Sequence, residues 1–261
     1  TQSRSSAASD VYKRQGLPRS KMEFIPQDWH NIASGRIWIL GNGPSLVEQL
    51  SLLKKLKSEA TMTCNGMPHW QELPFEPTYH ALTDVPLYKW LNRSAGPHWK
   101  HTQRFAFHRN GEDEHELFHT VPMEPDNIQV HSYGMAAMND EWELMRTART
   151  TPLTIAQIAW WMGYREFYYL GIEQSRGYAW APDQLTSNNN RSEFPADKNP
   201  RYSYAIMRCG RRMREDIESK GGTIYDCTPK GLLNPTGKEV TRRGISWQET
   251  FEYRDLAEVL G

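Results

Sequence analysis

The sequence predicts an α/β fold in which helices flank both faces of a mostly parallel sheet. Short apolar runs that end at glycine or a polar residue alternate with longer helical patterns along the chain. This alternation is typical of strands joined by crossover helices. The 261 residues contain no repeat or linker that divides them, so we expect a single domain.

The first half of the chain predicts three strands and one helix. RIWIL at 36–40 is an apolar run ended by glycine, which favours a buried strand. Leucines at steps of three and four residues in 45–57 indicate an amphipathic helix. Further strands are expected at 60–65 and 78–84. From there to about residue 125 the chain is rich in His, Trp and charge, and we expect loops and short helices.

The second half predicts two longer helices. In the helix expected at 151–163, Thr151 is suited to the N-cap, Pro152 to the first turn and Gly163 to the end. The remaining elements are expected in this order: a strand at 165–173, a loop at 174–200, a helix at 204–222, a strand at 223–229, and a final loop with a short helix.

Composition limits the setting and the partners. Lys plus Arg and Asp plus Glu both number 31, so no nucleic-acid partner is expected. The three cysteines are sparse and odd in number, which favours a reducing, cytoplasmic compartment. No apolar run suits a membrane span. Residues 1–23 are expected to be disordered or artefactual, and 24–261 to form the domain. The sequence does not indicate an oligomeric state.

The turn GNGPSL, which begins at Gly41, is the first candidate for a binding site. Gly41 and Gly43 permit a close backbone approach, while Asn42 and Ser45 carry hydrogen-bonding side chains. A glycine-rich turn between a strand and a helix can present N–H groups to an anion. The same residues also suit a tight turn with Ser45 as a helix cap, and the local pattern leaves both readings open.

Two further strand ends carry short polar side chains. Asn65 follows the second predicted strand and Asp84 ends the third. Ligands of open parallel sheets bind outside the carboxyl ends of the strands, so Asn42, Asn65 and Asp84 are expected to face one crevice. Turn chemistry alone also favours Asn and Asp at such positions.

Three blocks of the sequence together resemble a known superfamily. ILGNGPSL at 39–46, QIAWWMGYREFYYLGIEQSRGYAW at 157–180 and IYDCTPKGLL at 224–233 follow this layout. It is the layout of the bacterial sialyltransferases of the Campylobacter type and of the related MptE-like family, which includes a hydroxymethylpterin pyrophosphokinase. The resemblance implies a Rossmann-like fold and transfer from a nucleotide-bound donor. The sialyltransferases use a CMP-sugar and need no metal for chemistry, whereas the pyrophosphokinase uses ATP with Mg²⁺.

The resemblance also implies roles for individual residues. Nucleotide contacts fall on Asn42, Gly43 and Asn65, and Asp84 stands where the sialyltransferases have Asn. Tyr178, helped by Arg176, would stabilise the leaving phosphate. The remaining implied positions are Thr150 and Thr151 in the turn before the long helix, and Glu173 where the family has Asp.

One departure concerns the general base. The sialyltransferases carry a catalytic His just before the penultimate helix, but this chain has no His beyond His131. The equivalent region offers Tyr202 and Tyr204, and tyrosine with an ordinary pKa of about 10 is a poor base at neutral pH. Glu173 or a tyrosine would then accept the proton of the acceptor.

HELFH at 115–119 is a rival signal from a different class of enzyme. In a helix, His115 and His119 would share a face and bind zinc, and Glu116 could activate water. Glu141 or Glu143 could supply a third ligand. Polar flanks and the nearby Gly111 and Pro122 equally suit a short solvated helix.

The leading functional hypothesis is a nucleotide-dependent group transferase, specifically a sialyltransferase-like glycosyltransferase. It would take a nucleotide-sugar donor and a small-molecule or glycan acceptor, without a required cofactor. The alternatives are a pyrophosphokinase, in which Asp84 and Glu173 hold Mg²⁺ with ATP, a zinc hydrolase at HELFH, and a nucleotide-binding module without catalysis.

Overall fold

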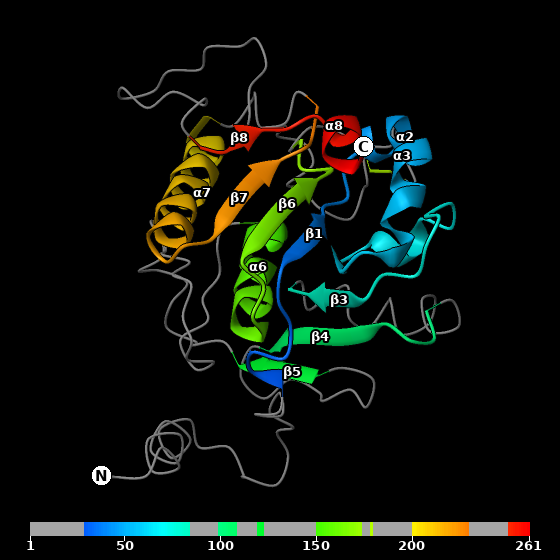
Figure 1. Ribbon diagram of the computed structural model, residues 1–261, viewed down its shortest axis with the longest axis horizontal. Helices are drawn as coiled ribbons and strands as arrows, with labels where there is room; N and C mark the ends of the chain where they lie inside the picture. The colour runs from blue at the N-terminus through cyan, green and yellow to red at the C-terminus, as the bar shows by residue number, and fades with distance from the viewer. Residues whose placement is uncertain are drawn as a thin grey trace, which may run out of the picture.

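A parallel β-sheet runs through the centre of the described chain, with helices packed against it (Figure 1). The computed structural model describes residues 29–83, 99–108, 119–122, 150–173, 178–179, 200–229 and 250–261. Within these ranges the strand order is β5-β4-β3-β2-β1-β6-β7-β8, and every neighbouring pair is parallel. The strands are β1 (Arg36–Leu40), β2 (Thr61–Cys64), β3 (Tyr79–Leu82), β4 (Gln103–His108), β5 (His119–Pro122), β6 (Glu166–Leu170), β7 (Thr223–Asp226) and β8 (Glu252–Tyr253).

The strand order reverses at β1, as it does in Rossmann-like folds. From β1 the chain steps outward through β2, β3, β4 and β5, and it then returns to the other side of β1 as β6. Such a reversal is a topological switch point, where crevices form at the carboxyl ends of the strands. The predicted α/β fold with a parallel sheet is confirmed.

Helices cover both faces of the sheet (Figure 1). Because side chains alternate along a strand, Ile37 and Ile39 of β1 join one buried cluster, while Trp38 and Leu40 join the other. The first cluster includes side chains of α6 (Thr151–Met162) and α7 (Pro200–Ser219). The second includes side chains of five short helices: α2 (Ser45–Glu48), α3 (Leu50–Leu53), η3 (Lys54–Ser58), η4 (Met67–His69) and α8 (Leu256–Leu260). No helix in the described ranges is long and apolar enough to cross a membrane.

The helix expected at 45–57 is interrupted. It consists of α2, α3 and the 3-10 turn η3, and Gln49 separates the first two with φ −95° and ψ 6°. The Gln49 side chain donates to the carbonyl of Cys227, at 3.1 Å, and so links the junction of α2 and α3 to the residue that follows β7. The leucine pattern still indicated the buried face, since Leu46, Leu53 and Leu56 are fully buried and Leu50 is partly buried against the same cluster.

The expectation of loops and short helices up to about residue 125 is wrong for part of that region. β4 and β5 extend the sheet there, with Phe105 in register with His119. Both lie towards one edge of the sheet, where a strand does not need the continuous apolar run that a central parallel strand has. The short β8 at the opposite edge was also not predicted.

The boundaries of the two long helices differ from expectation at their N-termini. The N-cap of α6 is Thr150, and Thr151 is the first helical residue, so the cap assigned to Thr151 is wrong. Gly163 ends α6 in the left-handed region, at φ +111°, as predicted. α7 begins at Pro200, four residues earlier than expected, because proline suits the first helical turn. Residues 1–23 lie outside the described ranges.

The sheet contains a buried histidine in β3. His80 of β3 is 2% exposed, its Nδ1 lies 3.0 Å from Thr63 Oγ1, and its ring packs edge-on against Trp99. Burial, with a smaller contribution from Arg104, lowers the pKa of His80 to about 3. The folded protein therefore holds this imidazole neutral.

The buried imidazole of His80 predicts a loss of stability in acid. Between pH 6.5 and about 3 the unfolded chain binds a proton here that the folded protein does not, so unfolding becomes easier by up to about 1.4 kcal/mol per pH unit. His80→Gln keeps a partner for the Thr63 hydroxyl, and urea titrations at several pH values should show a flatter decline. His101→Gln, on an exposed residue, is the control. Equal slopes for His80→Gln and the wild type would contradict this reading.

Candidate functional site

The candidate site lies at the switch point, where β1 and β6 end side by side. Leu40 of β1 is in register with Leu170 of β6, so the segments that follow begin at the same edge. From there the chain leaves β1 towards α2 and β2, whereas β7 continues the sheet beyond β6. The predicted turn GNGPSL and the predicted Glu173 therefore meet at this edge.

The two glycines of the turn allow contact with the segment after β6. The Gly41 N–H donates to the Leu170 carbonyl at 2.7 Å, and the Gly43 N–H donates to the Gly171 carbonyl at 2.9 Å. A Cβ atom on Gly41 would overlap the Gly171 carbonyl oxygen, and one on Gly43 would overlap the Glu173 carboxylate. The close approach that glycine permits is thus used within the protein itself.

Glu173 places its carboxylate inside the turn. Its Oε1 accepts a hydrogen bond from the Ser45 N–H at 2.5 Å, while its Oε2 is buried with no hydrogen-bond partner among the described residues. Burial raises the pKa of Glu173, and hydrogen bonds from Ser45 and from its own backbone oppose the rise. A phosphate cannot occupy the same place in this arrangement, because the turn already holds a negative group.

Asn42 connects the turn to the segment that contains Tyr178. Its carbonyl accepts a hydrogen bond from the Ala179 N–H at 2.9 Å, so Tyr178 lies next to the turn. The role at the donor phosphate that the resemblance implies for Tyr178 stays a prediction. The side-chain oxygen Oδ1 of Asn42 is buried and has no hydrogen-bond partner within the described ranges. Buried polar atoms usually have partners, so this oxygen and Glu173 Oε2 retain the capacity to accept hydrogen bonds.

A second group of polar side chains joins the ends of β2 and β3 to the start of α6. Asn65 has a left-handed backbone at φ +46°. Its Nδ2 donates to Thr151 Oγ1 at 2.8 Å, and its Oδ1 accepts from the Thr83 N–H at 3.1 Å. The Thr83 and Thr151 hydroxyls are 2.5 Å apart. The predicted residues Asn65 and Thr151 are therefore brought together. Thr150, the N-cap of α6, directly precedes Thr151.

This bonding pattern gives Asn65 a positioning role. The nitrogen and the oxygen of its amide each make one hydrogen bond inside the protein, which leaves one N–H and one lone pair for another partner. These two bonds fix the N-terminus of α6 relative to the sheet. Sequence reasoning missed Thr83, although its place just before Asp84 at a strand end was a usable signal.

Sequence reasoning also missed the residues that hold the segment after β6. The Ile172 N–H donates to Thr228 Oγ1 at 3.1 Å, and the Thr228 N–H donates to the buried carboxylate of Asp226 at 2.9 Å. Asp226 ends β7 and Thr228 follows it, far from Ile172 in the sequence, and no local pattern connects them.

Several predicted residues are not part of the described site. Asp84 and Arg176 lie outside the described ranges, so the proposed Mg²⁺ pair of Asp84 and Glu173 stays a prediction. The backbones of Tyr202 and Tyr204 belong to the first turns of α7. They therefore lie within the penultimate helix and not in a segment before it.

The helical zinc motif at HELFH is not supported. His119 is the first residue of β5, so His115 and His119 are not spaced on one continuous helix as the zinc-binding pattern requires. The other members of that proposal, His115, Glu116, Glu141 and Glu143, lie outside the described ranges. Within those ranges no group of three or more His, Cys, Asp or Glu side chains could hold a metal ion.

Comparison with known proteins adds no assignment. No protein-family model matches the chain, and no curated protein matches it. The resemblance of the three sequence blocks to sialyltransferases and the MptE-like family therefore supports a proposal of function only.

The raised pKa of Glu173 predicts how stability depends on pH. The folded protein holds the Glu173 proton more tightly than the unfolded chain does, so the free energy of unfolding should fall as pH rises above about 4.5, by up to about 1.4 kcal/mol per unit. Glu173→Gln keeps an acceptor for the Ser45 N–H and should remove this decline in urea titrations.

Glu72→Gln is the control for the Glu173 experiment, since Glu72 is exposed. This variant should follow the wild-type pH dependence. A Glu173→Gln protein that loses stability as steeply as the wild type between pH 5 and 8 would show that Glu173 does not titrate in this way.

Proposed function

We propose that this chain is a nucleotide-dependent group transferase, specifically a glycosyltransferase that uses a nucleotide-sugar donor of the CMP-sugar type. The observation that carries the proposal is a set of buried side-chain oxygens at the switch point that have no hydrogen-bond partner among the described residues: Asn42 Oδ1, Glu173 Oε2 and Ser45 Oγ. Unpaired buried acceptors cost free energy, and the hydroxyl groups of a nucleotide-sugar or of its acceptor would satisfy them.

The position of these oxygens supports the same proposal. They lie at the carboxyl ends of β1 and β6, where the strand order reverses, and ligands of open parallel sheets bind at such points. Asn65 and Thr151 fix the start of α6 at the same edge. Tyr178, beside the turn, is the residue that we assign to the leaving phosphate.

Glu173 is the residue that we assign as general base. A carboxylate is a better base at neutral pH when its pKa is raised, and burial raises the pKa of Glu173. In the proposed step the acceptor O–H bond breaks and its proton moves to Glu173 Oε2. The acceptor oxygen bonds to the anomeric carbon, and the bond from that carbon to the phosphate oxygen breaks, so that the nucleotide leaves with the electron pair.

A pyrophosphokinase is the second candidate, and one observation favours it. Asn42 in the turn and Glu173 in the segment after β6 offer an amide and a carboxylate oxygen at the same switch point, and Mg²⁺ is bound by oxygen ligands. In that case the ligand would be ATP, and its binding would depend on Mg²⁺.

Calorimetric titration tests the binding proposal. The wild type should bind CMP and CMP-sialic acid more tightly than ATP, with or without Mg²⁺. Asn42→Ala should weaken CMP binding about tenfold or more, because a polar contact is lost, while its melting temperature stays near that of the wild type. Gln71→Ala, on an exposed residue, is the matched control. The nucleotide proposal is wrong if none of these ligands binds, and Mg²⁺-dependent binding of ATP alone would favour the pyrophosphokinase.

Turnover tests the role of Glu173. Hydrolysis of CMP-sialic acid to CMP, in which water serves as the acceptor, should fall about 100-fold or more in Glu173→Gln, as expected for loss of a general base. The Kd for CMP should change little, and the remaining rate should lose its pH dependence. A variant with the wild-type rate would remove Glu173 from the chemistry. A wild type that binds CMP without any turnover would favour a binding module.

A further inference from the structure

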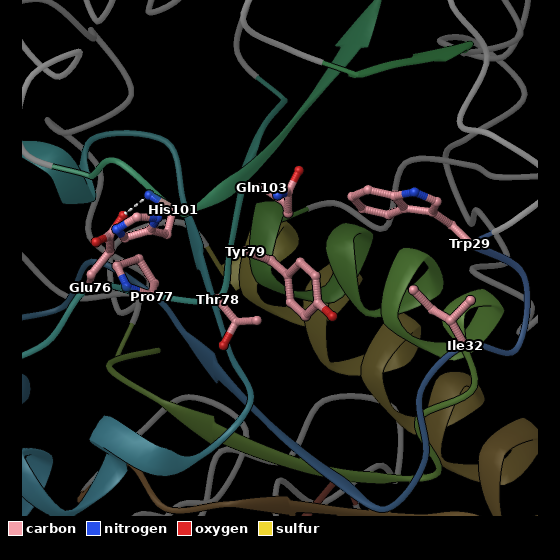
Figure 2. Close-up of a pocket in the computed structure, with 8 residues that line it drawn as sticks. All are labelled: Trp29, Ile32, Glu76, Pro77, Thr78, Tyr79, His101 and Gln103. Atoms are coloured by element: carbon pink, nitrogen blue, oxygen red, sulfur yellow. Dashed lines mark hydrogen bonds between the residues drawn. The ribbon is translucent and has the colours of Figure 1, made fainter.

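A cavity of about 550 Å³ opens at the N-terminal ends of β3 and β4, whereas the switch point lies at the carboxyl ends of the strands (Figure 2). Tyr79 and Gln103, the first residues of β3 and β4, line it. Because all the described strands are parallel, the cavity and the carboxyl-end crevice lie at opposite ends of the strands. A volume of about 550 Å³ falls within the range of small-molecule sites.

One side of the cavity is apolar and held in place. Figure 2 shows Trp29 and Ile32 together on this side, with the Tyr79 ring between them and the far side. The Trp29 ring packs edge-on against Phe105, at 5.5 Å between centroids, and Ile32 is 55% exposed. The N–H groups of Asn31 and Ala33 donate to carbonyls at the end of α6 and fix the segment.

The far side of the cavity carries polar side chains. Glu76 Oε1 accepts from the N–H groups of His101 and Thr102, at 2.5 Å and 3.0 Å, and the dashed line in Figure 2 marks the first of these bonds. The carboxylate is thereby fixed in orientation. The exposed side chains of Gln103 and His101 add an amide and an imidazole. Together these groups supply both donors and acceptors of hydrogen bonds.

The charge of the cavity favours a neutral ligand. Among the described residues that line it, Glu76 is the only acidic side chain, and none is Lys or Arg. Arg104 is close enough to Glu76 to interact with it electrostatically, and its guanidinium donates to the Trp99 carbonyl at 2.7 Å. The charge of Glu76 is therefore partly balanced from outside the cavity, which weakens the attraction for a cation.

We propose that this cavity binds a neutral pyranose sugar. A pyranose ring has an apolar C–H face that would lie against Trp29 and Ile32, since aromatic side chains offer large apolar surfaces. Its hydroxyl groups both donate and accept, as Gln103, Glu76 and His101 require. The site goes beyond the proposed transferase activity, because it lies at the N-terminal ends of the strands and needs no nucleotide.

Saturation-transfer NMR on the full chain tests this site with three probes: methyl α-D-glucopyranoside, methyl β-D-galactopyranoside and methyl N-acetyl-β-D-glucosaminide. At least one probe should bind saturably, with a Kd of about 1 to 10 mM and the strongest transfer to its ring C–H protons. Gln103→Ala and Trp29→Ala should each weaken binding about tenfold. Gln71→Ala is the matched control, because Gln71 is exposed and does not line the cavity.

Several outcomes would overturn the sugar site. The first is that no probe binds saturably up to about 50 mM. The second is that Gln103→Ala binds as the wild type does. Gln103 is an exposed residue, so this variant is informative even if Trp29→Ala does not fold. The third is that benzamidine, an aromatic cation, binds in a Glu76-dependent way while the pyranosides do not.

Two further results separate this site from the transferase proposal. Pyranoside binding that persists in Asn42→Ala and in the presence of saturating CMP supports the cavity, whether or not CMP itself binds. Pyranoside binding that is lost in Asn42→Ala but kept in Gln103→Ala would place the sugar in the crevice and overturn the inference.

Discussion

The contact between the turn after β1 and the segment after β6 is the constraint on which the site depends. Gly41 and Gly43 donate to consecutive carbonyls of that segment, at 2.7 Å and 2.9 Å, and side chains at either glycine would overlap it. Parallel pairing of β1 with β6 brings the two segments to the same edge. The turn therefore serves the protein's own packing first, and any ligand must use what this packing leaves available.

What the packing leaves available is a set of side-chain oxygens. A glycine-rich turn usually attracts an anion through its N–H groups, but here those of Gly43 and Ser45 bind the Gly171 carbonyl and the Glu173 carboxylate. Placing a carboxylate there reverses the preference of the turn, from ligands that accept hydrogen bonds to ligands that donate them. Sugar hydroxyls fit this preference better than a phosphate does.

The sequence predicted the parts of the fold that depend on local apolar patterns. The central strands read directly as short runs, and β1 was located at its observed bounds, because a strand buried on both faces must be apolar throughout. β4 and β5 were missed because strands near an edge tolerate polar residues, as Gln103 and Arg104 illustrate. The short β8 gave no pattern at all.

The sequence allowed several residues of the candidate site to be predicted, but not their hydrogen-bond partners. Polar residues at strand ends are visible locally and identified Asn42 and Asn65, whereas Glu173 was pointed out by the resemblance to the sialyltransferases. Their partners depend on contacts between residues 18 to 128 positions apart in the chain, such as Thr83 with Asn65 and Glu173 with Ser45. Only those contacts distinguish Asn65, whose amide nitrogen and oxygen each have a partner, from Asn42, whose buried oxygen has no partner in the described ranges. The same residue type at two neighbouring strand ends thus has two different roles, one structural and one available to a ligand.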